Sequence, residues 1–169
     1  MTLARRSVLL SGARLLVGGS IAALASACSR AGAASAPAAE RFEVALTDEQ
    51  WKAKLSPRAY AVLRHEGTEV PFTSALNDEH RTGSFTCAGC ALALFASQTK
   101  FDSGTGWPSF YQPLPNAVNQ RVDNSIGMSR DEVHCRRCGG HLGHVFDDGP
   151  KPTGLRYCMN GVAMAFTPA

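Results

Sequence analysis

The chain has 169 residues and a formal net charge of +3, a length that suits one folded domain with an N-terminal extension. Residues 1–33 contain four arginines and no acidic residue, whereas residues 34–169 contain 13 basic and 14 acidic side chains, a net charge of −1. A nearly neutral domain has no electrostatic basis for binding nucleic acid. We therefore expect no nucleic-acid partner.

The first 33 residues have the features of an export signal. Arg5 and Arg6 precede a stretch of small and apolar residues over 15–27, and no acidic residue occurs before Glu40. A basic start followed by an apolar segment is typical of secretory signals, and adjacent arginines indicate the twin-arginine route. An uncleaved membrane anchor is the alternative. The prediction is export to the periplasm or cell envelope.

Cys28 directly follows the run Leu24-Ala25-Ser26-Ala27. This pattern fits a lipoprotein site, at which the thiol would carry lipid and attach the chain to a membrane. It fits an ordinary cleavage point equally well, because Ala25 stands where a lipid box usually has a larger aliphatic residue. Both alternatives stay open, and neither gives Cys28 a role in chemistry.

Residues 34–44 are predicted to form a flexible tether, and residues 45–168 the folded domain. Thr47 with Gln50 three residues later is a capping-box pattern, which predicts a helix through Trp51 and Leu55. Ser56-Pro57 places a cap and a first-turn proline at the start of a second helix.

From Gly67 onward the apolar runs are short and separated by Gly, Pro, Asn and Asp. This spacing of apolar runs and turn residues is typical of strands joined by turns. The fold class predicted is mainly β and antiparallel, with short helices at the N-terminal edge. The expected strands are 84–86, 133–135, 143–146, 156–158 and 162–166.

Four of the six cysteines form two CxxC pairs, Cys87/Cys90 and Cys135/Cys138. Four thiolates complete a tetrahedral zinc shell, so one structural zinc ion is the preferred interpretation. The 44 residues between the pairs exceed the usual spacing of compact zinc modules. Two disulfides, which oxidising compartments favour, and a redox-active pair are the alternatives.

Cys158 stands apart from these pairs, two residues after Arg156 and two before Asn160. Residues i and i+2 of a strand share a face, so the three side chains are expected to project together. A guanidinium group beside a thiol favours the reactive thiolate. Cys158 is therefore a candidate nucleophile, although a buried structural cysteine explains an isolated Cys equally well.

His141 and His144 precede Cys158, and Trp107 ends a glycine-rich turn over 102–110. Either imidazole can serve as a proton donor; the alternatives are structural histidines or metal ligands beside Cys138. Trp107 can form the wall of a pocket for a small apolar group such as a methyl, or it can belong to the core.

Taken together, these segments resemble the methionine-R-sulfoxide reductase B family. The matching blocks occur in the family's order over about residues 45–168 and cover nearly the whole expected domain: His65–Glu69, Pro71–Thr73, Thr86–Cys90, Phe101–Phe110, His134–Cys138, His141–Pro150 and Arg156–Asn160.

The resemblance implies two antiparallel β-sheets, a zinc ion held by the four cysteines of the CxxC pairs, and reduction of the R epimer of methionine sulfoxide in proteins. It aligns Cys158 with the family nucleophile and places His141, His144, Arg156, Asn160 and Trp107 in the active site. The cysteine would become a sulfenic acid. A monomer is expected.

Two departures from the family pattern stand out. Thr105 occupies a position at which many relatives carry a resolving cysteine, so an external thiol is expected to reduce the sulfenic acid. Gly161-Val162-Ala163-Met164 replaces a run of the Ser-Ala-Ser-Leu type, which raises the question of pocket shape. A non-catalytic zinc-binding interaction module is the second hypothesis, and a cysteine hydrolase, which would need an oxyanion hole, is the third.

Overall fold

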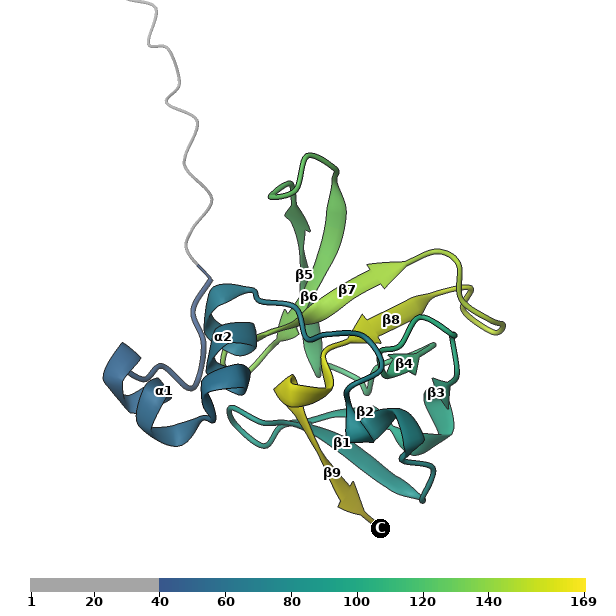
Figure 1. Ribbon diagram of the computed structural model, residues 1–169, viewed down its shortest axis with the longest axis horizontal. Helices are drawn as coiled ribbons and strands as arrows, with labels where there is room; N and C mark the ends of the chain where they lie inside the picture. The colour runs from purple at the N-terminus through teal and green to yellow at the C-terminus, as the bar shows by residue number, and fades with distance from the viewer. Residues whose placement is uncertain (1–39) are drawn as a thin grey trace, which may run out of the picture. The chain divides into compact units, whose positions relative to one another are not determined.

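The structure is a computed structural model that describes residues 40–169. The predicted signal, Cys28 and most of the predicted tether lie outside these residues. The described part contains two antiparallel sheets and two short α-helices (Figure 1), which confirms the predicted fold class. None of the helices within residues 40–169 is long and apolar enough to span a bilayer.

Both predicted helices are present, and both begin at the expected caps. The first, α1 (Asp48–Lys54), starts with a full capping box in which Thr47 and Gln50 bond each other's backbone. The second, α2 (Pro57–His65), begins after the Ser56 side chain, which accepts a hydrogen bond from the N–H of Ala59. These helices lie beside the β-sheets and bury Trp51, Val62 and Leu63 in the common core.

The smaller sheet has the strand order β2-β1-β9, and the larger has the order β3-β4-β8-β7-β6-β5. Every strand pair is antiparallel. The bounds are β1 (Gly83–Cys87), β2 (Ala93–Ala96), β3 (Lys100–Phe101), β4 (Ser109–Phe110), β5 (Val118–Asp123), β6 (Arg130–Cys135), β7 (His141–Phe146), β8 (Arg156–Met159) and β9 (Met164–Pro168).

One expected strand, 162–166, begins and ends two residues later than predicted. Residues 161–163 form a 3-10 turn, η3 (Gly161–Ala163), and β9 begins only at Met164. The cause is a side chain from outside the strand, because the Glu69 carboxylate accepts hydrogen bonds from the N–H groups of Gly161 and Val162. Two further 3-10 turns are η1 (Ala75–Asp78) and η2 (Ser97–Thr99).

An aromatic cluster joins the two sheets. Phe85 of β1 and Phe95 of β2 both contact Phe110 of β4, with ring centroids 4.9 and 4.3 Å apart. All three rings are fully buried, and rings in such contact stabilise a core beyond their area alone. The cluster therefore fixes the smaller sheet against the end of the larger sheet that carries β4 and β8.

The domain contacts begin before residue 45. The Val44 N–H donates to the carbonyl of Arg137 at 3.0 Å, and the Phe42 ring meets the buried His134 ring edge-on. The Glu40 carboxylate accepts a hydrogen bond from His134 at 2.9 Å. Residues 40–44, which the sequence assigns to the tether, are thus bound to the domain.

Candidate active site and metal centre

The cysteines of the two CxxC pairs form a single cluster. Their four Sγ atoms all lie within 4.8 Å of one another, with 3.7 Å between Cys87 and Cys138 and 3.5 Å between Cys90 and Cys135. A tetrahedral ion with metal–sulfur bonds of about 2.3 Å separates its ligands by roughly 3.8 Å. The cluster therefore fits a structural metal. The alternative of two disulfides is wrong, because all five described cysteines are free thiols.

The two CxxC turns have the same local form. The N–H of Ala91 donates to the Cys87 carbonyl, and the N–H of Gly139 donates to the Cys135 carbonyl, each at 2.8 Å. Both donors have positive φ angles, 59° at Ala91 and 67° at Gly139. Gly139 adopts this conformation without a side-chain penalty, whereas Ala91 adopts it with one.

Cys158 lies on β8, whose alternation separates the core from the site. Tyr157 and Met159 are buried in the core, so Arg156 and Cys158 project from the opposite face. The Cys158 side chain is half-buried and lines a cavity of about 110 Å³. The residues that line this Cys158 pocket are Thr68, Trp107, Arg130, Gly143, His144, Phe146, Cys158 and Asn160.

The neighbours of Cys158 are set by strand register. His144 of β7 is its direct cross-strand partner. A Cβ atom at Gly143 would lie 2.1 Å from the Cys158 carbonyl oxygen, so a glycine is needed for this approach of β7 to β8. The Thr105 hydroxyl lies 3.8 Å from the Cys158 sulfur. The position at which many relatives carry a cysteine therefore faces the thiol directly.

The two histidines occupy different environments. His144 lines the Cys158 pocket and donates from Nε2 to the Asp123 carboxylate at 2.8 Å. His141 is buried, does not line the pocket, and donates from Nδ1 to Glu132 at 2.7 Å. The rings are edge-on with centroids 5.4 Å apart. Of the two candidates, only His144 is in a position to meet a substrate in this pocket.

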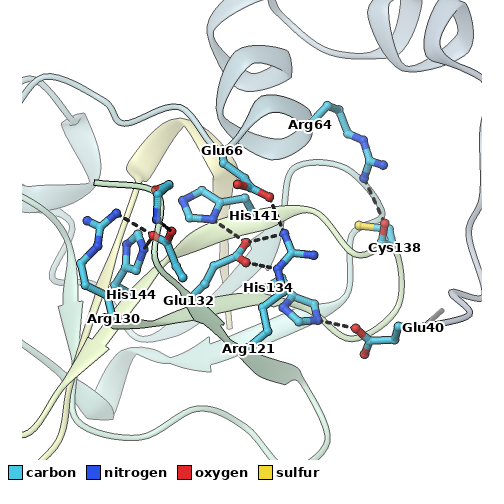
Figure 2. A network of polar contacts seen from close by, with 12 residues as sticks. Glu40, Arg64, Glu66, Arg121, Arg130, Glu132, His134, Cys138, His141 and His144 are labelled. Atoms are coloured by element: carbon cyan, nitrogen blue, oxygen red, sulfur yellow. Dashed lines mark hydrogen bonds and ion pairs between the residues drawn. The ribbon is translucent and has the colours of Figure 1, made fainter. Parts of the chain in front are cut away.

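Each carboxylate also accepts hydrogen bonds from an arginine. Arg130 donates to Asp123 at 2.6 Å, and Arg121 donates to Glu132, as Figure 2 shows. Hydrogen bonds from Ser125, His144 and Arg130 hold the pKa of Asp123 well below its usual range. Burial raises the pKa of Glu132, but hydrogen bonds from His141 and Arg121 outweigh it and leave that pKa lowered. Both carboxylates are ionised and fix their histidines.

Burial sets the charge of His144. Desolvation lowers the pKa of His144, and the charges of Arg130 and His141 lower it further, while the hydrogen bond to Asp123 acts in the opposite direction. The imidazole is therefore neutral at neutral pH. Because its Nε2–H is donated to Asp123, its other nitrogen carries a lone pair that can accept a proton.

Arg156 has another partner. It forms two hydrogen bonds of 2.8 Å to the Asp148 carboxylate and lies over the Phe146 ring. The pKa of Arg156 is raised first by these bonds to Asp148, and the charge of Cys158 adds to the shift. Arg156 thus shares a face with Cys158, as predicted, but it does not line the Cys158 pocket.

Trp107 and Asn160 are both held by one residue of the segment that follows α2. The indole N–H donates to the Glu69 carbonyl at 2.9 Å, and the Glu69 N–H donates to the Asn160 side-chain oxygen at 2.7 Å. Asn160 also donates to the Leu142 carbonyl at 3.0 Å. These bonds fix both side chains at the wall of the pocket.

Sequence reasoning missed several residues of this site, among them Asp123, Arg130 and Glu132. Arg130, Glu132 and His134 alternate along β6 and therefore share a face, a signal that was available in the sequence. Their partners on β5 could not be predicted from the sequence, because the hairpin register depends on the turn between the strands.

The departure at Gly161 does not open the Cys158 pocket. A Cβ atom at Gly161 would lie 1.8 Å from the Ser74 hydroxyl oxygen and 2.7 Å from its Cβ, so Ser74 fills that space. Val162 lines a separate cavity of about 310 Å³ between α2 and residues 67–73, where no cysteine or histidine lies.

Replacing Gly161 with Ala is expected to lower the free energy of unfolding by about 1–3 kcal/mol, because the added methyl overpacks against Ser74. Urea unfolding measures the change. Adding Ser74→Gly should recover part of the loss through a favourable coupling between the two sites. Strictly additive losses in the double variant would contradict the steric account.

Comparison with known proteins agrees with this geometry. The sequence profile described as the SelR domain matches residues 55–168. A protein of Leptospira interrogans serogroup Icterohaemorrhagiae serovar Lai (strain 56601) is 52% identical over 126 residues, which cover 74% of this chain and 96% of that protein. The chain belongs to the MsrB family.

A second family member, from Thiobacillus denitrificans (strain ATCC 25259 / T1), is 55% identical over 123 residues, 72% of this chain and 93% of that protein. Both relatives carry the name peptide methionine sulfoxide reductase MsrB. The matched SelR domain contains the whole Cys158 pocket and all four cysteines of the metal cluster.

Proposed function

We propose that this chain reduces the R epimer of methionine sulfoxide in proteins, with Cys158 as the nucleophile. The observation that carries the proposal is the half-buried Cys158 thiol beside the neutral His144 in a pocket of about 110 Å³. A cavity of this size suits the end of one side chain rather than a folded surface. Trp107 provides the wall against which the substrate methyl packs, and this contact selects the epimer.

The reaction needs no proton beyond the one on the Cys158 thiol, which His144 carries. The Cys158 sulfur forms a bond to the sulfoxide sulfur. The oxygen then moves to the Cys158 sulfur while the sulfur–sulfur bond and the original sulfur–oxygen bond both break, which leaves a sulfenic acid on Cys158. His144 accepts the thiol proton and returns it to the oxygen. Cys158 loses two electrons and the substrate sulfur gains two, so methionine is released.

The test is turnover of peptides that contain R- or S-methionine sulfoxide, with excess dithiothreitol, by the wild-type chain and by Cys158→Ser. Turnover of the R epimer alone, lost in the variant, supports the proposal. A folded wild-type chain that reduces neither epimer would refute it and would favour the non-catalytic interaction module.

We propose that an external thiol completes the cycle. Two external thiols reduce the Cys158 sulfenic acid back to a thiol. They become a disulfide with each other, and one water molecule is released. Within residues 40–169, the four cysteines other than Cys158 all belong to the metal cluster, and Thr105 faces the sulfur.

Thr105→Cys is therefore expected to form an intramolecular disulfide with Cys158 after one turnover. The Thr105 hydroxyl and the Cys158 sulfur are 3.8 Å apart, so a modest shift brings two sulfurs to bonding distance, about 2.05 Å. Mass spectrometry of digested protein detects the cross-linked peptide. The wild-type chain, treated in the same way, should show the sulfenic acid and no disulfide that involves Cys158.

The metal is proposed to be zinc. Four thiolates in a tetrahedral arrangement suit Zn²⁺ or an iron–sulfur centre, and sulfur pairs at 3.5 and 3.7 Å fit one small ion. The ion would hold the two CxxC turns together and keep their sulfurs from oxidation. It supplies folding energy and takes no part in the reaction.

Residues 1–33 are proposed to direct export to the periplasm or cell envelope, on the strength of Arg5-Arg6 and the apolar stretch that follows. Either lipidation at Cys28 or cleavage next to it completes the process, and the mature domain acts as a monomer. Cell fractionation of the wild-type chain beside a variant with both arginines changed to lysine tests the route, and metabolic lipid labelling beside Cys28→Ala separates the two endings.

A further inference from the structure

We propose that Arg130 is the residue that binds the sulfoxide oxygen of the substrate, an inference that rests on the proposed function. Arg130 is the one arginine among the residues that line the Cys158 pocket. Arg156, which the sequence places beside the thiol, has its Nε and Nη2 engaged by the Asp148 carboxylate instead. The cation that lines the pocket therefore comes from β6, while Arg156, on which the charge of Cys158 also acts, is held outside the lining by Asp148.

Arg130 is fixed next to His144 by a single carboxylate oxygen. The Asp123 Oδ2 atom accepts from Arg130 Nη2 at 2.6 Å and from His144 Nε2 at 2.8 Å. One acceptor shared by the two side chains, both of which line the Cys158 pocket, sets their relative position. A ligand atom in the pocket is therefore close to both the His144 imidazole, which can carry a proton, and the Arg130 guanidinium, which is always charged.

The guanidinium group also has hydrogen-bonding capacity left over. The Arg130 Nε–H is buried and has no acceptor among the residues that the structure describes. Buried donors in proteins almost always have a partner, and a small rotation of the Arg130 side chain, which lines the Cys158 pocket, would bring this donor to an oxygen of a ligand.

Arg130 and His144 have different roles, which follow from the chemistry of their side chains. The sulfoxide oxygen carries partial negative charge, which grows as its bond to sulfur breaks. A guanidinium group stays protonated throughout, so Arg130 stabilises this charge and transfers no proton. His144 moves the thiol proton to the same oxygen, which ends on Cys158. Fixed cationic donors aimed at developing charge are an effective catalytic device.

A purely structural role for Arg130 makes a different prediction. In that case Arg130 would only hold the β5–β6 hairpin through Asp123, and its loss would disturb His144 and Cys158 together. Reactions of Cys158 with any electrophile would then slow down. If Arg130 binds the oxygen, its loss affects only substrates that have an oxygen on the attacked sulfur.

The experiment compares the full-length wild-type chain with Arg130→Met and Arg130→Lys. Two rates are measured at one pH: kcat/KM for an R-methionine-sulfoxide peptide, and alkylation of Cys158 by iodomethane, an electrophile without oxygen. Arg81→Met is the matched control, because it removes an exposed arginine that also pairs with a carboxylate, Glu79, but does not line the Cys158 pocket.

Arg130→Met is expected to reduce kcat/KM by about 10²- to 10³-fold, with the alkylation rate of Cys158 unchanged within about twofold. Arg130→Lys should restore part of the loss, and Arg81→Met should match the wild-type chain. Unchanged sulfoxide reduction in Arg130→Met, or a parallel fall of both rates, would overturn the inference. A wild-type chain that alkylates normally but reduces no sulfoxide would instead refute the proposed function, and the role of Arg130 with it.

Discussion

Replacing Cys138 with serine is expected to leave the chain without its metal and largely unfolded at neutral pH. Cys138 is a buried member of the four-sulfur cluster. Structural zinc sites in small peptides contribute on the order of 10–16 kcal/mol, whereas whole domains are stable by about 5–15 kcal/mol. Loss of one metal ligand can therefore remove most of the free energy of unfolding. Circular dichroism and metal analysis of the purified variant measure both effects.

Cys158→Ser is the matched control, because it makes the same chemical change outside the cluster. It should retain one metal ion per chain and a wild-type unfolding transition. A strong chelator at raised temperature should unfold the wild-type chain and Cys158→Ser alike. A Cys138→Ser variant that stays cooperatively folded, with a wild-type chain insensitive to chelator, would contradict the role of the cluster.

Replacing His144 with asparagine is expected to lower kcat/KM by about 10²- to 10⁴-fold, the usual range for a lost proton-transfer group. The neutral imidazole is the form that accepts the thiol proton. Burial lowers the pKa of His144, so this form persists to lower pH than for an exposed histidine. Wild-type activity should therefore fall only as pH drops below the ordinary histidine range of about 6.5, and the acid limb should be absent in the variant.

His141→Asn separates the two histidines. Its imidazole is bound to Glu132 and does not line the Cys158 pocket, so the variant should keep the acid limb of the pH–rate profile. Rates measured over a range of pH with a peptide substrate test both variants. An unchanged profile in His144→Asn would remove it from the mechanism, and unchanged profiles in both variants would remove histidine chemistry altogether.

Local signals in the sequence predict much of this fold. The capping residues Thr47 and Ser56 predict where α1 and α2 begin, since a cap depends on only three or four neighbouring residues. The strand at 162–166 was placed two residues early. Its start is determined by Glu69, more than ninety positions away in the chain, and no local pattern contains that information.

In the site, too, local sequence patterns predict some features, while others depend on residues far apart in the chain. The CxxC spacing predicts the metal cluster, and strand alternation predicts that Arg156 and Cys158 share a face. The partner of each side chain was not predictable, because it depends on the register of β5, β6 and β7. Asp123 bonds the histidine of a strand that is not its neighbour, and Asp148 rather than Cys158 binds Arg156.

The most direct test of the central claim follows the oxygen atom itself. A peptide with R-methionine sulfoxide carrying heavy-isotope oxygen is mixed with stoichiometric reduced protein, without a thiol reductant, and the protein is trapped and digested for mass spectrometry. The account predicts one heavy oxygen on Cys158 per methionine formed, and none from the S epimer. Methionine formation with an unmodified Cys158, or heavy oxygen on the cysteines of the cluster, would contradict it.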